Sequence, residues 1–283
     1  MKLIADSGSS KTEWNLIFQD GTVKTILSGG LNPYFLDEVQ IAERISDEVK
    51  PEIPEDCQIQ KIYFYGAGCA HKAKQDVVHG GLRIHFPEAT IEVHSDLLGA
   101  ARSLCQYKEG LIGILGTGSN CAFYNGYFLS SKVPSLGFIL GDEGGGVAFG
   151  KKILKSFLYS ELPQNLLSEF NREYNLSVDE ILENIYRKPQ PNRFIASFTP
   201  FVAKHKSEKI ITRIVDSVLE EFFTSIILKF EEHKSFPLHL TGSVAWIFQD
   251  EIKTTGKKLD VRIGNIAQSP GVGLVSFHKN EKA

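Results

Sequence analysis

Three short loops of small polar residues could bind a phosphate group, and each follows an apolar run that is typical of a strand. The loops span residues 6–11, 116–120 and 241–243. Small residues let backbone N–H groups approach an anion, and the hydroxyls in these loops add further donors. One such loop is most often an ordinary turn. Three of them at equivalent strand ends, one carrying an acid, favour nucleotide binding.

The first loop differs from a Walker A motif, which needs G-x-x-x-x-G-K-[ST] between a strand and a helix. Lys11 lacks the preceding glycine, and the alternating residues after it predict a strand. We therefore expect the phosphates to lie against a β-hairpin. The segment 141–146 does not complete a dinucleotide motif either, because Glu143 stands where the second glycine should be.

An acid beside the first loop indicates a metal-dependent phosphate site. Asp6 ends the first apolar run, and such a carboxylate can hold Mg²⁺ through water. Lys11 is the only cation near these loops, so metal and backbone donors must offset the polyphosphate charge. The sequence predicts a Mg²⁺-dependent site built from Asp6, Ser10, Thr117 and Gly118.

Two further acids, Asp96 and Asp142, each come just before a predicted helix. A helix N-cap is the ordinary role of such an Asp. The histidines show no zinc spacing, and no G-x-S-x-G elbow is present. Phosphoryl transfer is favoured over covalent catalysis, because it needs only positioned phosphates, a metal and one acid.

The elements that position these loops occur twice. Strand, polar loop, strand, hairpin and strand begin at Leu3 and again at Leu111, with Asp20-Gly21 and Asn125-Gly126 as the hairpin turns. This self-similarity predicts a duplicated α/β domain. We expect one domain over 1–107, completed by a helix at 270–283, and a second over 108–269.

Apolar spacing predicts the remaining elements of the second half. Paired apolar residues every fourth position predict one long helix between Glu208 and Glu232. A helix over 245–252 and a last strand over 259–263 follow it. No low-complexity linker separates the two predicted domains.

Composition excludes several classes of protein. The chain has 283 residues and a formal net charge of −3, so it lacks the basic excess of a general nucleic-acid binder. No apolar run approaches the ~20 residues of a membrane span, and the N-terminus has no secretory h-region. The four cysteines never form C-x-x-C. We expect a cytoplasmic protein that binds neither nucleic acid nor membrane.

Several motifs together resemble one known family. They are Ser95–Ala101, Gly116–Asn120, Gly137 and Gly141–Gly145. Their order and spacing are similar to those of the N-acetylglucosamine kinase family, grouped with the activator ATPases of benzoyl-CoA reductase in the actin–hexokinase–heat-shock ATPase superfamily. The resemblance implies an α/β fold of two ribonuclease H-like, actin-like ATPase domains, with a nucleotide- and sugar-binding cleft between them.

The resemblance also implies an activity, the transfer of phosphate from ATP, with Mg²⁺, to the 6-hydroxyl of an amino sugar, N-acetylglucosamine first. Asp96 would be the general base. The residues expected to bind ATP are Asp6, Ser9, Ser10, Lys11, Thr117, Gly118, Gly242 and Ser243. Those expected to bind the sugar are Asn32, Ser135, Leu136, Gly137 and Asp142.

Departures from the family pattern leave alternatives open. Ser7 and Ser9 stand where the family often has Gly, Leu136 where some relatives have an aromatic residue, and 203–207 where a Gly-Asp pair is usual near the adenine. N-acetylmuramic acid or glucosamine could be the substrate. An iron–sulfur activator ATPase, whose cysteines hold a cluster across a dimer, is the main alternative, and a sugar sensor is a third class. A homodimer remains open.

Overall fold

A computed structural model of the chain describes residues 1–8 and 10–280. The chain divides into two compact units. The first comprises residues 1–108 and 125–129 together with the segment from 269 onward, and the second comprises 109–124 and 130–268. No helix of the described residues is long and apolar enough to span a membrane.

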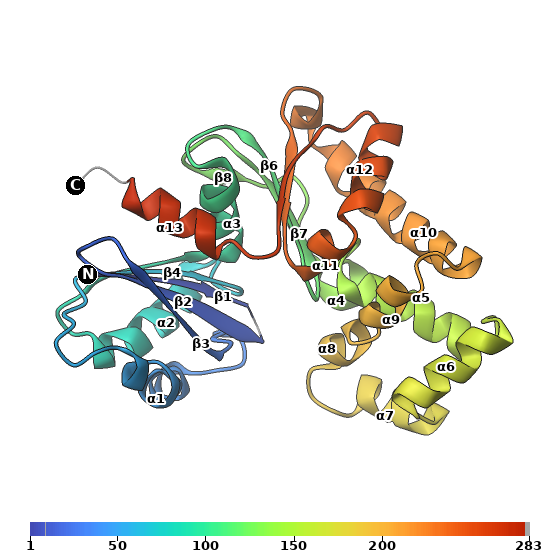
Figure 1. Cartoon of the computed structure of the whole chain (residues 1–283), viewed down its shortest axis with the longest axis horizontal. Helices are drawn as coiled ribbons and strands as arrows, with labels where there is room; N and C mark the ends of the chain where they lie inside the picture. Colours follow the sequence, from blue (N-terminus) through green and yellow to red (C-terminus); the bar gives the residue numbers. More distant parts are fainter. Residues whose placement is uncertain (9, 281–283) are drawn as a thin grey trace. The chain divides into compact units, whose positions relative to one another are not determined.

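Unit 1 is built on a mixed sheet of order β3-β2-β1-β4-β5 (Figure 1). Its strands are β1 (Lys2–Ser7), β2 (Lys11–Ile17), β3 (Val23–Gly29), β4 (Lys61–Gly66) and β5 (Thr90–Ser95). β2 pairs antiparallel with β1 and β3, whereas β1, β4 and β5 run parallel. The predicted hairpin at Asp20-Gly21 therefore joins the second and third strands of this sheet.

Helices cover both faces of this sheet (Figure 1). The helices are α1 (Glu38–Glu48), η1 (Lys50–Glu52), α2 (Lys72–His85), α3 (Asp96–Cys105) and α13 (Gly271–Lys279). Because side chains alternate along β1, Leu3 and Ala5 join the core under α1 and α2. Ile4 faces the other way and packs with Tyr63 and Leu274, on the side of α3 and α13.

Unit 2 repeats the topology with the order β10-β9-β6-β7-β8. Its strands are β6 (Gly110–Leu115), β7 (Ser119–Tyr124), β8 (Leu129–Ser130), β9 (Leu238–Thr241) and β10 (Ile263–Ala267). β6 pairs antiparallel with β7 and parallel with β9, as β1 does with β2 and β4. The predicted α/β class with two sheets of one topology is confirmed.

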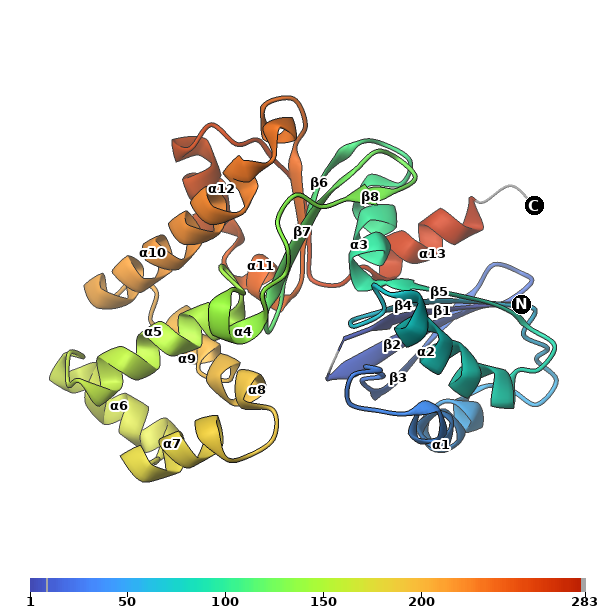
Figure 2. The same ribbon diagram turned by 180° about the vertical axis from the view of Figure 1, so that it is seen from behind.

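The rest of unit 2 is helical (Figure 2). The elements are α4 (Gly137–Leu140), α5 (Gly146–Leu158), α6 (Gln164–Tyr174), α7 (Val178–Tyr186), α8 (Pro191–Ala196), α9 (Thr199–Lys204), α10 (Lys209–Ser225), η2 (Ile227–Lys229), η3 (Glu231–Lys234), α11 (Ser243–Ile247) and α12 (Gln249–Lys258). α5 packs against α8, α9 and α10, and α12 packs against α10. Gly150 of α5 lies so close to α8 that an added Cβ would overlap the carbonyl oxygen of Ile195.

Three predicted elements of unit 2 differ from the structure. The long helix ends at Ser225, and two 3₁₀ turns follow it. Its apolar pattern continues because Phe230 remains buried in the same core. The predicted helix over 245–252 is two helices, α11 and α12. The last strand begins at Ile263, because the backbone N–H of Leu259 still bonds to the last turn of α12.

Candidate active site

Two carboxyl groups lie at the ends of β1 and β5, the two strands that flank β4 in the sheet of unit 1. Asp6 is the penultimate residue of β1, and Asp96 follows β5 as the first residue of α3. The Ser95 hydroxyl caps that helix by accepting from the Leu98 N–H at 3.3 Å. The Asp96 Oδ1 accepts from the Leu97 N–H at 2.9 Å. The helix start therefore fixes one oxygen of the Asp96 carboxylate.

Burial weakens the acidity of both carboxyl groups. Burial first, and then the charges of Asp96 and Glu13 against an opposing effect of Lys11, together raise the pKa of Asp6 from 3.8 to about 7. Burial also raises the pKa of Asp96, although the bond from Leu97 opposes this. As whole residues, Asp6 and Asp96 are each half-buried. The pair is thus poised to accept a proton or a cation.

The donors around Asp6 suit magnesium. Mg²⁺ prefers hard oxygen ligands and is usually bound through one or two carboxylates, water and substrate phosphates. Asp6 supplies such a carboxylate. Among residues 1–8 and 10–280, no group of three or more His, Cys, Asp or Glu side chains could hold a metal by itself. The fit is therefore to a cation that arrives with phosphate.

The raised pKa of Asp6 makes a prediction about stability. The pKa of Asp6 is about 7 in the folded protein, compared with an ordinary value of 3.8. The protonated carboxyl therefore contributes stability that is fully present below pH 3.8 and is lost as the pH rises through 7. The Asp6→Asn side chain does not titrate. Its free energy of unfolding is therefore expected to rise relative to that of the wild type as the pH rises. The gain is at most about 1.4 kcal/mol per pH unit.

Unfolding in urea at pH 5 and pH 8, without nucleotide or metal, measures this difference. Asp20→Asn is the control, because hydrogen bonds from Thr22 lower the pKa of Asp20 and move its titration below this range. An Asp6→Asn difference that is equal at both pH values would contradict the prediction.

The predicted sugar residue of unit 1, Asn32, is 92% buried in the loop after β3 (8% exposed). Its Oδ1 accepts from the Tyr34 N–H at 2.9 Å. Gly68 has a φ of +84°, and an added Cβ there would lie 2.6 Å from Asn32 Oδ1. Only a glycine therefore lets the segment after β4 approach Asn32 so closely.

The first phosphate loop is only partly described. Ser9 lies outside the described residues. Ser10 and Lys11 are exposed, and Thr12 is buried. The charge of Lys11 acts on Asp6, which ties the start of β2 to the carboxyl pair. The structure thus gathers Asp6, Lys11 and Asp96 in one part of unit 1.

In unit 2, the loop between β6 and β7 is braced by the start of α5. The N–H groups of Gly146 and Val147 donate to the carbonyl oxygens of Gly116 and Thr117, at 2.8 and 2.9 Å. Those two helix N–H groups are therefore already used.

Asp142 lies directly on this second loop. Its Oδ1 accepts from the Ser119 N–H at 3.1 Å, and an added Cβ on Gly118 would lie 2.6 Å from both of its oxygens. Burial raises the pKa of Asp142, while the bond from Ser119 and the charge of Lys151 lower it. Asp142 has a φ of +65°, which is a left-handed backbone that Asp adopts more readily than most residues.

The other predicted sugar residues of unit 2 lie on an exposed segment. Ser135 and Gly137 are exposed, and Leu136 is 53% exposed. This segment leads into the glycine-rich residues 141–146. The Gly141 N–H donates to the Gly137 carbonyl oxygen at 2.8 Å and so joins the two. Its apolar neighbour Leu140 is 74% exposed. The segment therefore offers an apolar surface next to Asp142.

The third loop meets the second at Gly242. This residue has a φ of +114°, and an added Cβ would overlap the carbonyl oxygen of Leu115 at the end of β6. Ser243 then begins α11. The hydroxyls of Ser119 and Thr241 are buried without a hydrogen-bond partner. The sequence analysis assigned neither hydroxyl a role, although both belong to the loops that it singled out.

Comparison with known proteins places the chain among sugar kinases. No protein-family model matches it. A solved structure from Porphyromonas gingivalis, provisionally named an N-acetylglucosamine kinase, is 38% identical, covers 99% of both chains and has a TM-score of 0.94. A Chromobacterium violaceum structure with the same provisional name shares the fold, at 14% identity, 98% coverage of both chains and a TM-score of 0.73.

A curated relative matches over part of its length. It is the N-acetylmuramic acid/N-acetylglucosamine kinase of Clostridium acetobutylicum, which is 32% identical over 129 residues. That match covers 42% of this chain and 41% of the relative. The chain thus aligns with about two fifths of this protein's length.

Proposed function

Because the chain belongs to the N-acetylglucosamine kinase family, within the actin–hexokinase–heat-shock ATPase superfamily, we propose that it phosphorylates the 6-hydroxyl of an amino sugar with ATP. N-acetylglucosamine is the first candidate substrate. The observation that carries this proposal is the pair of buried carboxyls, Asp6 and Asp96, at the ends of β1 and β5 of one sheet, where the charge of Asp96 acts on Asp6. The two units would be actin-like ATPase domains, 1–107 with 270–283 and 108–269.

Asp96 is the proposed general base. Its carboxylate accepts the proton of the sugar hydroxyl while the hydroxyl oxygen bonds to the γ-phosphorus and the bond to the ADP oxygen breaks. The bond from Leu97 orients this carboxylate. Burial raises its pKa, which makes it a stronger proton acceptor than an exposed Asp.

The phosphate-binding role is proposed for two loops. Ser9, Ser10 and Lys11 in unit 1, and Thr117 and Gly118 in unit 2, would supply backbone and side-chain donors. Asp6 would hold Mg²⁺ through water, and the ion would offset the charge of the transferred phosphoryl group. Gly242 and Ser243 would lie beside the adenosine, at the point where the backbone of Gly242 packs against the end of β6.

The sugar-binding role is proposed for Asn32 and for the glycine-rich part of unit 2. That part comprises Ser135, Leu136, Gly137 and Asp142. A carboxylate accepts hydrogen bonds from sugar hydroxyls, and the exposed Leu136 offers an apolar surface to a sugar ring or an acetyl group. The name of the Clostridium relative makes N-acetylmuramic acid the second candidate substrate.

The buried cysteines do not favour an iron–sulfur activator. A cluster is held by thiolates, which need deprotonated and accessible sulfur. Cys105 and Cys121 are both buried, and burial raises the pKa of Cys105 to about 12 and that of Cys121 as well. Their thiols are thus held in the protonated form.

A coupled assay tests the proposed function. Purified protein with ATP and Mg²⁺ is expected to form ADP in the presence of N-acetylglucosamine, N-acetylmuramic acid or glucosamine. The rate of ADP formation with N-acetylgalactosamine is expected to be much lower. Mass spectrometry of the product identifies the phosphorylated sugar. The proposal fails if no amino sugar in the panel raises ADP release above that of ATP alone.

A further inference from the structure

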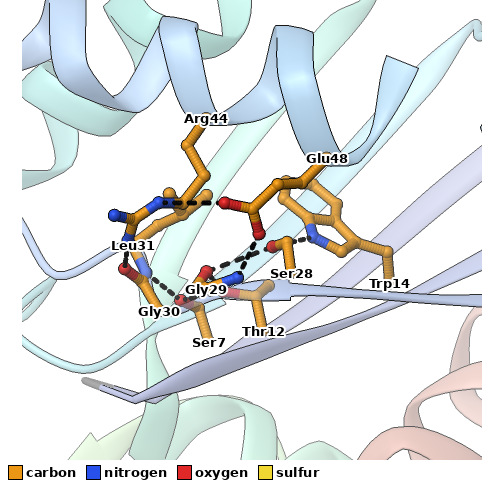
Figure 3. Close-up of polar contacts among 9 residues, drawn as sticks. All are labelled: Ser7, Thr12, Trp14, Ser28, Gly29, Gly30, Leu31, Arg44 and Glu48. Carbon is orange, nitrogen blue, oxygen red and sulfur yellow. Dashed lines mark hydrogen bonds and ion pairs between the residues drawn. The ribbon is translucent and has the colours of Figure 1, made fainter. Parts of the chain in front are cut away.

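A row of three hydroxyls crosses the first three strands of unit 1. The register pairs Ser7 of β1 with Thr12 of β2, and Thr12 with Ser28 of β3. Each of these side chains is at most 8% exposed. The indole nitrogen of Trp14 donates to Ser28 Oγ at 2.9 Å (Figure 3). The row therefore lies inside the sheet's covered face, just below the first phosphate loop.

The hydroxyls of Ser7 and Thr12 close a hydrogen-bonded ring with the loop after β3. The Leu31 N–H donates to Ser7 Oγ at 3.0 Å, and Thr12 Oγ1 donates to the Gly29 carbonyl at 3.1 Å. The two hydroxyls are 2.8 Å apart. Since the Thr12 proton goes to Gly29, the Ser7 hydroxyl must donate to Thr12, in preference to its 3.4 Å contact with the Gly8 carbonyl.

The same loop is held from two other directions (Figure 3). The Gly30 N–H donates to the carbonyl of Ser10, in the phosphate loop, at 3.1 Å. From α1, Arg44 donates to the Gly30 carbonyl at 2.8 Å, and Glu48 accepts from the Gly29 N–H at 2.6 Å. The backbone of residues 29–31 is thus bonded to the phosphate loop and to α1, beyond the end of the sheet ladder.

This loop leads directly into Asn32, the proposed sugar residue. The phosphate loop carries Ser10, which is proposed to contact ATP. A shift of either loop would break the ring and leave buried donors and acceptors unpaired, which costs far more than a bond exchanged with water. The two loops therefore move as one body.

We propose that Ser7 and Thr12 are positioning residues that couple the phosphate loop (residues 6–11) to the sugar loop (residues 29–32). Through this coupling, binding of one substrate favours binding of the other. This inference rests on the proposed function. Neither hydroxyl needs to touch a substrate, because each acts through the peptide groups of Gly29 and Leu31.

Thr12→Val tests the coupling. Valine keeps the shape of threonine but removes the donor to Gly29 and the acceptor for Ser7. Calorimetry measures the affinity for N-acetylglucosamine with and without a non-hydrolysable ATP analogue and Mg²⁺. Coupling between two sites is typically about 5–150-fold. We expect about tenfold tighter sugar binding with nucleotide in the wild type, and less than about twofold in Thr12→Val.

Two variants serve as controls. Thr12→Ser keeps the hydroxyl and is expected to retain the wild-type coupling. Thr25→Val makes the same substitution at the far end of the same strands, where Thr25 Oγ1 donates to Asn15 Oδ1 at 3.0 Å, and should also retain it. In steady-state assays, Thr12→Val should raise both KM values by about tenfold, while kcat at saturation changes by less than about threefold.

Four results would contradict the proposed coupling. The proposal is overturned if Thr12→Val lowers the unfolding temperature but keeps the wild-type coupling, because the ring would then be only structural. It is also overturned if Thr12→Ser loses as much coupling as Thr12→Val, or if an active wild-type kinase binds sugar equally with and without nucleotide. If the wild type phosphorylates no amino sugar, the proposed function fails and the coupling proposal fails with it.

Discussion

Replacing Asp96 by asparagine is expected to lower kcat by about 10²–10⁴-fold, the usual range for the loss of a general base. The amide has the shape of the carboxylate and can still accept the Leu97 N–H at the start of α3. It cannot take a proton from a sugar hydroxyl. The KM for ATP is expected to change by less than about threefold, because the proposed phosphate contacts lie in the loops 6–11 and 116–120.

Asp142→Asn is the matched comparison for this experiment. Asp142 is also a partly buried Asp in the predicted site, but it is assigned to sugar hydroxyls, so its loss should mainly raise the KM for sugar. The comparison needs kcat and both KM values for each variant. Near-normal kcat in Asp96→Asn, with kcat lost in Asp142→Asn, would reverse the two roles.

Gly150→Ala is expected to destabilise unit 2 by about 2 kcal/mol or more. Alanine normally stabilises a helix interior by up to about 1 kcal/mol relative to glycine. Here the new methyl group would overlap the backbone carbonyl of Ile195, so α5 and α8 must move apart. The cost of that movement in a packed core exceeds the gain in helix propensity.

Gly80→Ala separates the two effects. Gly80 is also inside a helix, α2, but its added Cβ would meet only the carboxyl end of Glu38, a side chain that can turn away. This variant is expected to be neutral or slightly stabilised. Thermal unfolding followed by tryptophan fluorescence reports on both units, because Trp14 lies in unit 1 and Trp246 in unit 2. An unchanged midpoint in Gly150→Ala would show that the α5–α8 contact yields without cost.

Local patterns were enough to predict the three-strand opening of each half. Alternating residues, a polar loop and an N-G or D-G turn define each three-strand opening without reference to the rest of the chain. The helix predicted to run past Ser225 was wrong, because the apolar positions recur through the 3₁₀ turns and Phe230 stays in the core. Periodicity reports burial, and burial does not require a helix.

The site was predictable only where one loop carried its own signal. Asp6 and Asp96 stand out as acids at strand ends, and the structure places both in unit 1. The contact of Asp142 with Ser119 and Gly118 joins segments about 23 residues apart. No local sequence pattern predicts this contact. The ring of Ser7 and Thr12 likewise depends on a register that only the folded sheet defines.

Unit 1 is assembled from segments at opposite ends of the sequence, and this sets the order in which the molecule can be made. Residues 109–268 separate β1–β5 from α13, apart from the short segment 125–129 that rejoins unit 1. A ribosome adding about 5–20 residues per second needs roughly ten to thirty seconds to cross that interval. During this time the nascent chain leaves uncovered the apolar face of Ile4 and Tyr63 that Leu274 later packs against. Unit 1 therefore completes its core only after nearly the whole chain has been made.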